Sequence, residues 1–256
     1  MHKLNQRTIL AVLLLGLAVS PTSQAADIGD FFGGKPKSEK GAAQVAGTPK
    51  TGTDPQSTRP VGPQATLSPA QIEGFRSARF GYAESELRAA MRKDLGVSDK
   101  DIVAASNDTE RTSSLTAKAN NLLPDSGMAT VSYILGARAK KLIQVNVLWG
   151  GVEPGAANLA TLVGLSNSLR GYFLEQGSYV KETLLANQPL DDGTVLVFRG
   201  ADDKGRMVLL RLVPEPKKER DKNAPKDARE AHGMLLLSYI ENPKNPDVFR
   251  IEKGQF

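Results

Sequence analysis

The chain has 256 residues and a net charge of +5, with no cysteine and two histidines. Without cysteine there are no disulfide bonds and no cysteine nucleophiles, and one histidine besides His2 cannot build a structural zinc site. The sequence has no G-x-S-x-G, G-x-G-x-x-G or P-loop motif. We therefore predict no catalytic residue, no cofactor and no metal ion.

Residues 1–25 have the pattern of a secretory signal peptide. Lys3 and Arg7 precede an apolar run over residues 8–19, and small residues at 23–25 follow it. A basic start, a short apolar run and a small-residue cleavage site are typical of such peptides. The run is shorter than the ~20 residues that span a bilayer. We expect cleavage after Ala25, export to the periplasm and no integral membrane span in the mature chain.

Residues 26–66 are predicted to form a disordered tether. Residues 35–65 are rich in Gly, Pro, Thr, Ser, Gln and Lys, and such a segment cannot bury enough apolar surface to offset the entropy of ordering. Phe31 and Phe32 are the exception. Two aromatic residues beside glycines either dock onto another protein, or form a stub that matters only for processing or packs on the chain's own domain. They are the candidate partner-binding residues of the sequence.

A first helix-plus-sheet unit is predicted over residues 67–152. Ser68 and Pro69 predict the start of a short helix over 70–78. An apolar stripe predicts a second helix over 84–95, which Gly96 would end. Alternation and β-branched content predict strands at 102–105, 115–121, 129–135 and 141–149, of which 115–121 also fits a helix.

A second helix-plus-sheet unit is predicted over residues 153–256. It starts with an amphipathic helix over 158–175 and continues with strands at 180–185, 194–199, 207–213 and 234–240. Residues 217–230 carry bases and acids in nearly equal number, which favours a solvated loop over an anion-binding patch. Removal of residues 1–25 would take Lys3 and Arg7 from the charge of +5 and leave +3. We expect no nucleic-acid partner.

Residues 80–88, Phe-Gly-Tyr-Ala-Glu-Ser-Glu-Leu-Arg, resemble the aromatic-Gly-x-[Ser/Thr]-x-x-x-[Val/Leu] entry of small envelope proteins of the BamE/SmpA type. The sequence departs from that pattern at Ala83 and lacks the family's lipid-anchoring cysteine. For residues 67–256 the resemblance implies helices packed on an antiparallel sheet, as in the tandem beta-lactamase-inhibitor-protein (BLIP) fold, and a role in binding proteins. It carries no functional residue across. The fold class predicted is α+β, with two successive helix-then-antiparallel-sheet units packed as a BLIP/SmpA-like body, and the sequence leaves open whether they share one sheet.

Other features have both a functional and a structural interpretation. The acid pairs at 191–192 and 202–203 suggest calcium or glycosidase chemistry, but they lie beside glycines, which favours turns. Trp149 is expected in a ligand groove or in the core. His232 is the one histidine available for a Ser-His-Asp arrangement, and it directly precedes a predicted strand, as a loop histidine would.

Three functions are consistent with these patterns. The first is an exported, non-enzymatic module for protein binding or envelope assembly, with another envelope protein as its partner. The second is a hydrolase of a cell-envelope polymer, which needs two carboxylates about 5 to 10 Å apart across a cleft. The third is a small-molecule carrier, which needs a closed apolar cavity.

Overall fold

The structure is a computed structural model, and it describes residues 67–151, 155–215, 232–251 and 254. The predicted signal peptide, the predicted tether with Phe31 and Phe32, and the predicted charged loop at 217–230 lie outside these residues. The predicted boundary between the two units falls at residues 152–154, which also lie outside.

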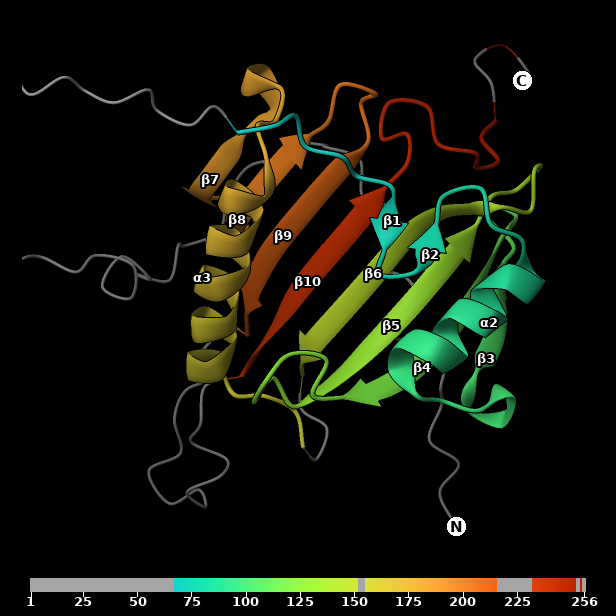
Figure 1. Cartoon of the computed structure of the whole chain (residues 1–256), viewed down its shortest axis with the longest axis horizontal. Coiled ribbons are helices and arrows are strands. Elements are labelled where there is room, and N and C mark those ends of the chain that lie inside the picture. The colour runs from blue at the N-terminus through green and yellow to red at the C-terminus, as the bar shows by residue number, and fades with distance from the viewer. Residues whose placement is uncertain (1–66, 152–154, 216–231, 252–253, 255–256) are drawn as a thin grey trace, which may run out of the picture.

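One antiparallel sheet of eight strands forms the centre of the described chain (Figure 1). The strand order is β3-β4-β5-β6-β10-β9-β8-β7. Strands that follow one another in the sequence are therefore neighbours in the sheet, except for β6 and β7, because β6 pairs with β10. The strands are β3 (Val103–Asn107), β4 (Thr112–Asn120), β5 (Met128–Leu135), β6 (Leu142–Gly150), β7 (Leu185–Pro189), β8 (Val195–Ala201), β9 (Met207–Pro214) and β10 (Gly233–Ile240).

Two α-helices cover one face of this sheet. Helix α2 (Glu84–Leu95) has the predicted bounds, since Glu84 and Glu86 lie in its first turn and Gly96 ends it at a φ of 68°. Helix α3 (Leu159–Gln176) begins after Asn158, whose side chain accepts a hydrogen bond of 2.9 Å from the Thr161 N–H. Figure 1 shows both helices on the same side of the sheet.

The helix predicted over residues 70–78 is wrong. This segment contains a two-stranded hairpin of β1 (Gly74–Phe75) and β2 (Ala78–Arg79). Gly74 has a φ of 145°, and a Cβ atom there would lie 2.1 Å from the Ala78 carbonyl oxygen. Only glycine fits this close approach. The segment therefore forms a hairpin, although Ser68 and Pro69 are typical of the start of a helix.

Strand β7 also differs from prediction. The sequence predicted a strand over 180–185, but Lys181–Thr183 forms a short 3-10 helix and the strand follows at Leu185–Pro189. Strands β3, β4, β5, β6, β8, β9 and β10 lie within a few residues of their predicted positions. The strand alternative is thus the correct one for residues 115–121, which overlap β4.

The predicted fold class is wrong. The described chain is mostly β, with the eight-stranded sheet, the two-stranded hairpin and two α-helices. It does not divide into two helix-then-sheet units packed as a BLIP/SmpA-like body. The reason is the pairing of β6 with β10, with Leu237 opposite Val147, which joins all eight strands into one continuous sheet.

The hydrophobic core lies between this sheet and the layer formed by α2, α3 and the β1–β2 hairpin. Helix α2 contributes Leu87 and Met91, and helix α3 contributes Leu162 and Phe173. Alternate residues of the strands complete one continuous cluster, including Leu115, Val131, Tyr133, Val145, Val147, Trp149, Phe198, Leu210, Leu212, Leu235 and Leu237. One face of the sheet therefore packs in the hydrophobic core.

Candidate functional site

The opposite side of the sheet is the candidate site, and we call it the open face. It consists of the strand residues that alternate with the core residues, because successive side chains of a strand point to opposite faces. Both described α-helices contribute to the core cluster on the other side. Among the described residues, no α-helix packs on the open face.

The strand pairing aligns the open-face residues in rows across the sheet. The central row has hydroxyl and amide side chains in the middle and larger side chains at the β7 end: Val103, Thr116, Ser132, Asn146, Ser238, Leu209, Arg199 and Leu185. The next row contains Lys118, Thr130, Leu148, Leu236, Arg211, Leu196 and Gln188.

Apolar side chains are prominent on the open face of β9 and β10. Leu209 and Leu236 are half-buried, and Met234 is 37% exposed. Met207 and Ile240 lie opposite each other nearer the ends of these strands. When one face of an antiparallel sheet meets water, that face is normally polar. These strands are instead apolar on both faces, as strands are when both faces are covered.

Polar atoms without partners lie on the open face of β4, β6 and β9. The Ser114 Oγ, Asn146 Nδ2 and Arg211 Nε atoms are buried and have no hydrogen-bond partner in the described structure. The Asn146 Oδ1 atom does have one, since it accepts a hydrogen bond of 2.9 Å from Gln144 Nε2. A buried donor without an acceptor is unfavourable, and it marks where a ligand group would be stabilised.

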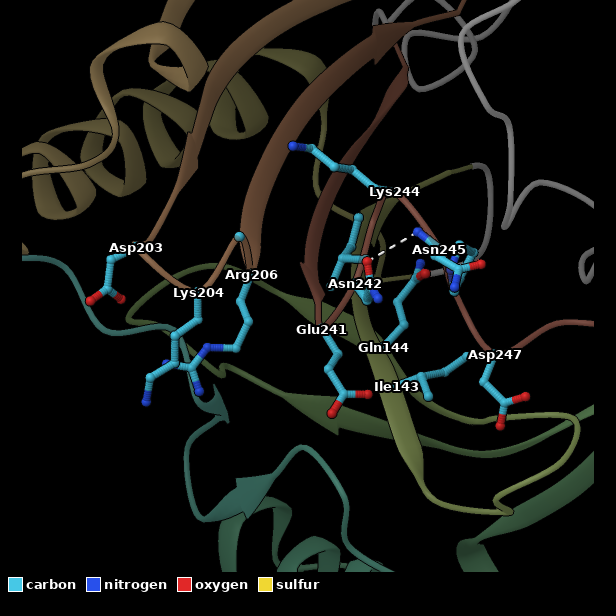
Figure 2. Close-up of a pocket in the computed structure, with 13 residues that line it drawn as sticks. Ile143, Gln144, Asp203, Lys204, Arg206, Glu241, Asn242, Lys244, Asn245 and Asp247 are labelled. Atoms are coloured by element: carbon cyan, nitrogen blue, oxygen red, sulfur yellow. Dashed lines mark hydrogen bonds between the residues drawn. The ribbon is translucent and has the colours of Figure 1, made fainter.

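A polar depression with a volume of about 690 Å³ lies at one end of the sheet, where the β8–β9 turn meets residues 241–247 (Figure 2). Three carboxyl groups, of Asp203, Glu241 and Asp247, are found around it. Asp247 accepts hydrogen bonds from the backbone N–H groups of Arg138 and Ala139, so its carboxylate anchors the C-terminal segment to the β5–β6 turn.

Burial raises the pKa of the Glu241 carboxyl group above its ordinary range, and the nearby Arg206 guanidinium partly opposes this shift. In Figure 2 the carboxyl groups of Asp203, Glu241 and Asp247 lie at separate places around the depression and do not point at one another. This arrangement gives no pair of carboxylates facing each other across the depression.

The two acid pairs of the sequence belong to turns. Asp202 is buried and binds the backbone N–H groups of Lys204 and Arg206, with the Arg206 guanidinium 2.7 Å from its carboxylate. Asp192 accepts a hydrogen bond from the Thr194 N–H in the turn before β8. Among the described residues, no group of three or more histidine, aspartate or glutamate side chains is arranged to hold a metal ion.

The remaining single residues are also structural. Trp149 is 2% exposed and lies in the core, so the core interpretation is confirmed. Trp149 therefore does not belong to the open face. His232 is half-buried directly before β10, and its backbone oxygen accepts a hydrogen bond from the Glu215 N–H.

No protein-family model, curated protein or solved structure matches this chain. The resemblance of residues 80–88 to BamE/SmpA-type proteins therefore stays a prediction. None of the helices in the described part of the chain is long and apolar enough to cross a membrane.

Sequence reasoning missed the open face. The signal was present in 207–213 and 234–240, whose apolar residues follow one another instead of alternating with polar ones. Such runs are typical of strands buried on both faces. The prediction of candidate binding residues relied on Phe31 and Phe32, which lie outside the described residues.

Proposed function

We propose that this chain is an exported, non-enzymatic module that binds another envelope protein through the open face of its eight-stranded sheet. The observation that carries the proposal is the apolar surface of β9 and β10, formed by Leu209, Leu236 and Met234, on the face that neither described α-helix covers. A surface of this kind is stabilised when a partner removes it from water.

The unpartnered polar atoms add specificity to this surface. A polypeptide partner offers carbonyl oxygens and carboxylates, which would accept hydrogen bonds from Asn146 and Arg211 once small shifts of the surrounding side chains open these buried donors. A partner without such acceptors would leave these donors buried and unpaired, which opposes binding. The open face would therefore discriminate between partners of similar apolar character.

The two alternative functions receive less support. A hydrolase needs two carboxylates that face each other across a cleft, whereas Asp247 at the polar depression is engaged by backbone N–H groups. A carrier needs a closed apolar cavity, and the depression is lined mostly by charged and amide side chains.

Site-specific photo-cross-linking in the native cells tests the proposal. A photoreactive amino acid replaces Leu209 or Leu236 on the open face, and Ser85 or Lys93, exposed on α2, serves as the control position. We expect one envelope protein to be cross-linked from Leu209 and Leu236 and not from the α2 positions. Equal cross-linking from both sets, or cross-linking from α2 alone, would contradict the proposal.

A further inference from the structure

We propose that the partner segment that docks on the open face is acidic as well as apolar, and that Arg199 and Arg211 bind its carboxylates. This inference rests on the proposed function, because it names the partner chemistry of the same surface. It comes from the distribution of charge over the eight strands.

All charged residues in the eight strands are bases. None of the strand residues from β3 to β10 is aspartate or glutamate, and the charged ones are Lys118, Arg199 and Arg211. All three are open-face residues by the strand pairing. The acids near the sheet, such as Asp192 and Asp202, lie in turns. The carboxyl groups of Glu241 and Asp247 lie at the depression beside Gln144 and Ile240. The β8–β9 part of the open face, with its two arginines, therefore attracts a negatively charged partner and repels a basic one.

The two arginines are close neighbours on adjacent strands. Arg199 of β8 lies opposite Leu209, and Arg211 of β9 lies opposite Leu196 of β8. The arginines are therefore diagonal neighbours across the β8–β9 pair. Two positive charges so placed repel each other, and no strand residue supplies a carboxylate between them.

The hydrogen bonding of Arg211 is incomplete, whereas the Nε atom of Arg199 has a partner. The Arg199 Nε atom donates to the Thr183 carbonyl oxygen at 3.1 Å. The Arg211 Nε atom is buried and has no hydrogen-bond partner in the described structure. A guanidinium group binds a carboxylate through two parallel hydrogen bonds, so an incoming acid would neutralise the charge of a half-buried guanidinium group.

Apolar side chains surround the two arginines, and they indicate that the partner segment also carries apolar residues. Arg211 is flanked along its row by Leu196 and Leu236, and Arg199 by Leu209 and Leu185. A carboxylate that reaches either arginine must therefore bring its neighbours against leucine side chains. A segment with large apolar residues next to aspartate or glutamate satisfies both requirements.

The test uses the full-length chain in its native cells, with the photoreactive amino acid at Leu209. The double variant Arg199→Glu/Arg211→Glu is compared with Lys93→Glu/Lys100→Glu, which makes the same change in net charge at exposed residues of α2 and the turn after it. We expect the arginine variant to lower the cross-linking yield at least tenfold and the lysine variant to change it less than twofold. Mass spectrometry should locate the cross-link beside aspartate or glutamate residues of the partner.

Reversal of those partner acids to lysine should restore cross-linking to the Arg199→Glu/Arg211→Glu variant. If that variant does not fold, Arg199→Gln/Arg211→Gln replaces it. An unchanged yield from the arginine variant would overturn this inference while leaving open-face binding intact. Cross-linking to residues 26–34 of this chain, or to a second copy, would overturn the assignment of a separate acidic partner. A missing cross-link at Leu209 would overturn the proposed function itself.

Discussion

The carboxylate of Asp202 accepts a hydrogen bond of 3.1 Å from the backbone N–H of Ile72, which lies 130 residues earlier in the chain. The same carboxylate binds the N–H groups of Lys204 and Arg206 and pairs with the Arg206 guanidinium. One buried acid thus connects the β8–β9 turn to the segment that leads into the β1–β2 hairpin. It links the first described segment of the chain to one of the last strands.

Replacement of Asp202 by alanine should lower the free energy of unfolding by about 3 kcal/mol, because it leaves the largely buried Arg206 and several N–H groups without their acceptor. Asp203→Ala is the matched control, since Asp203 is exposed in the same turn, and should change the free energy by less than about 0.5 kcal/mol. Urea unfolding of both variants measures the difference. Equal effects would show that the contacts of Asp202 do not stabilise the fold.

Gly150 and Gly205 have similar backbone angles, with φ values of 87° and 79°, but different surroundings. A Cβ atom at Gly150 would lie 2.3 Å from the Gly233 oxygen, whereas one at Gly205 meets nothing within 4 Å. Gly205→Ala should therefore cost about 1 kcal/mol for its backbone angle alone, and Gly150→Ala about 3 kcal/mol. Thermal unfolding of the two variants measures the difference in stability. Equal losses would contradict the close approach of Gly150 to Gly233 between β6 and β10.

The pH dependence of stability should reflect Glu241. Burial raises the pKa of this carboxyl group in the folded chain, so the folded chain holds the proton more tightly than the unfolded chain. The stability that Glu241 contributes is therefore lost as pH rises through its folded-state pKa. Glu241→Gln should stabilise the protein at pH 7 and have little effect at pH 4, as urea unfolding at both values would show.

The Phe31→Ala/Phe32→Ala variant tests whether the two candidate partner-binding residues, which lie outside the described residues, bind a partner. If these aromatic side chains dock onto a partner, the variant should weaken partner capture several-fold and leave the melting temperature unchanged. Pull-down of the cross-linked partner together with thermal unfolding measures both. Equal capture by the variant and the natural chain would remove these two residues from the binding surface.

Local patterns predicted elements better than they predicted pairing. Helix α2 was predicted with its observed bounds because its apolar stripe, its end charges and Gly96 all act within a few residues. The helix over 70–78 was predicted from Ser68 and Pro69, but Gly74 brings the backbone against Ala78 and forms a hairpin. The capping residues Ser68 and Pro69 carry no information about the contact between Gly74 and Ala78.

The open face could be predicted only in part, because it depends on which strands are neighbours. The leucines of 207–213 and 234–240 indicated two buried faces, but nothing local places Leu148 of β6 beside Leu236 of β10. That neighbour follows from the sheet order, in which β10 is inserted between β6 and β9. Pairing between strands distant in the chain leaves no periodic signal in the sequence.

The insertion of β10 between β6 and β9 has a consequence for the order of folding during synthesis. Strand β6 pairs on one side with β5, and its other side stays unpaired until Gly233–Ile240, the last strand of the sheet, has been made. Unpaired apolar strands pair readily with other molecules. A nascent chain that stops before β10 would thus present the unpaired edge of β6 to other molecules, and only the synthesis of β10 closes that edge.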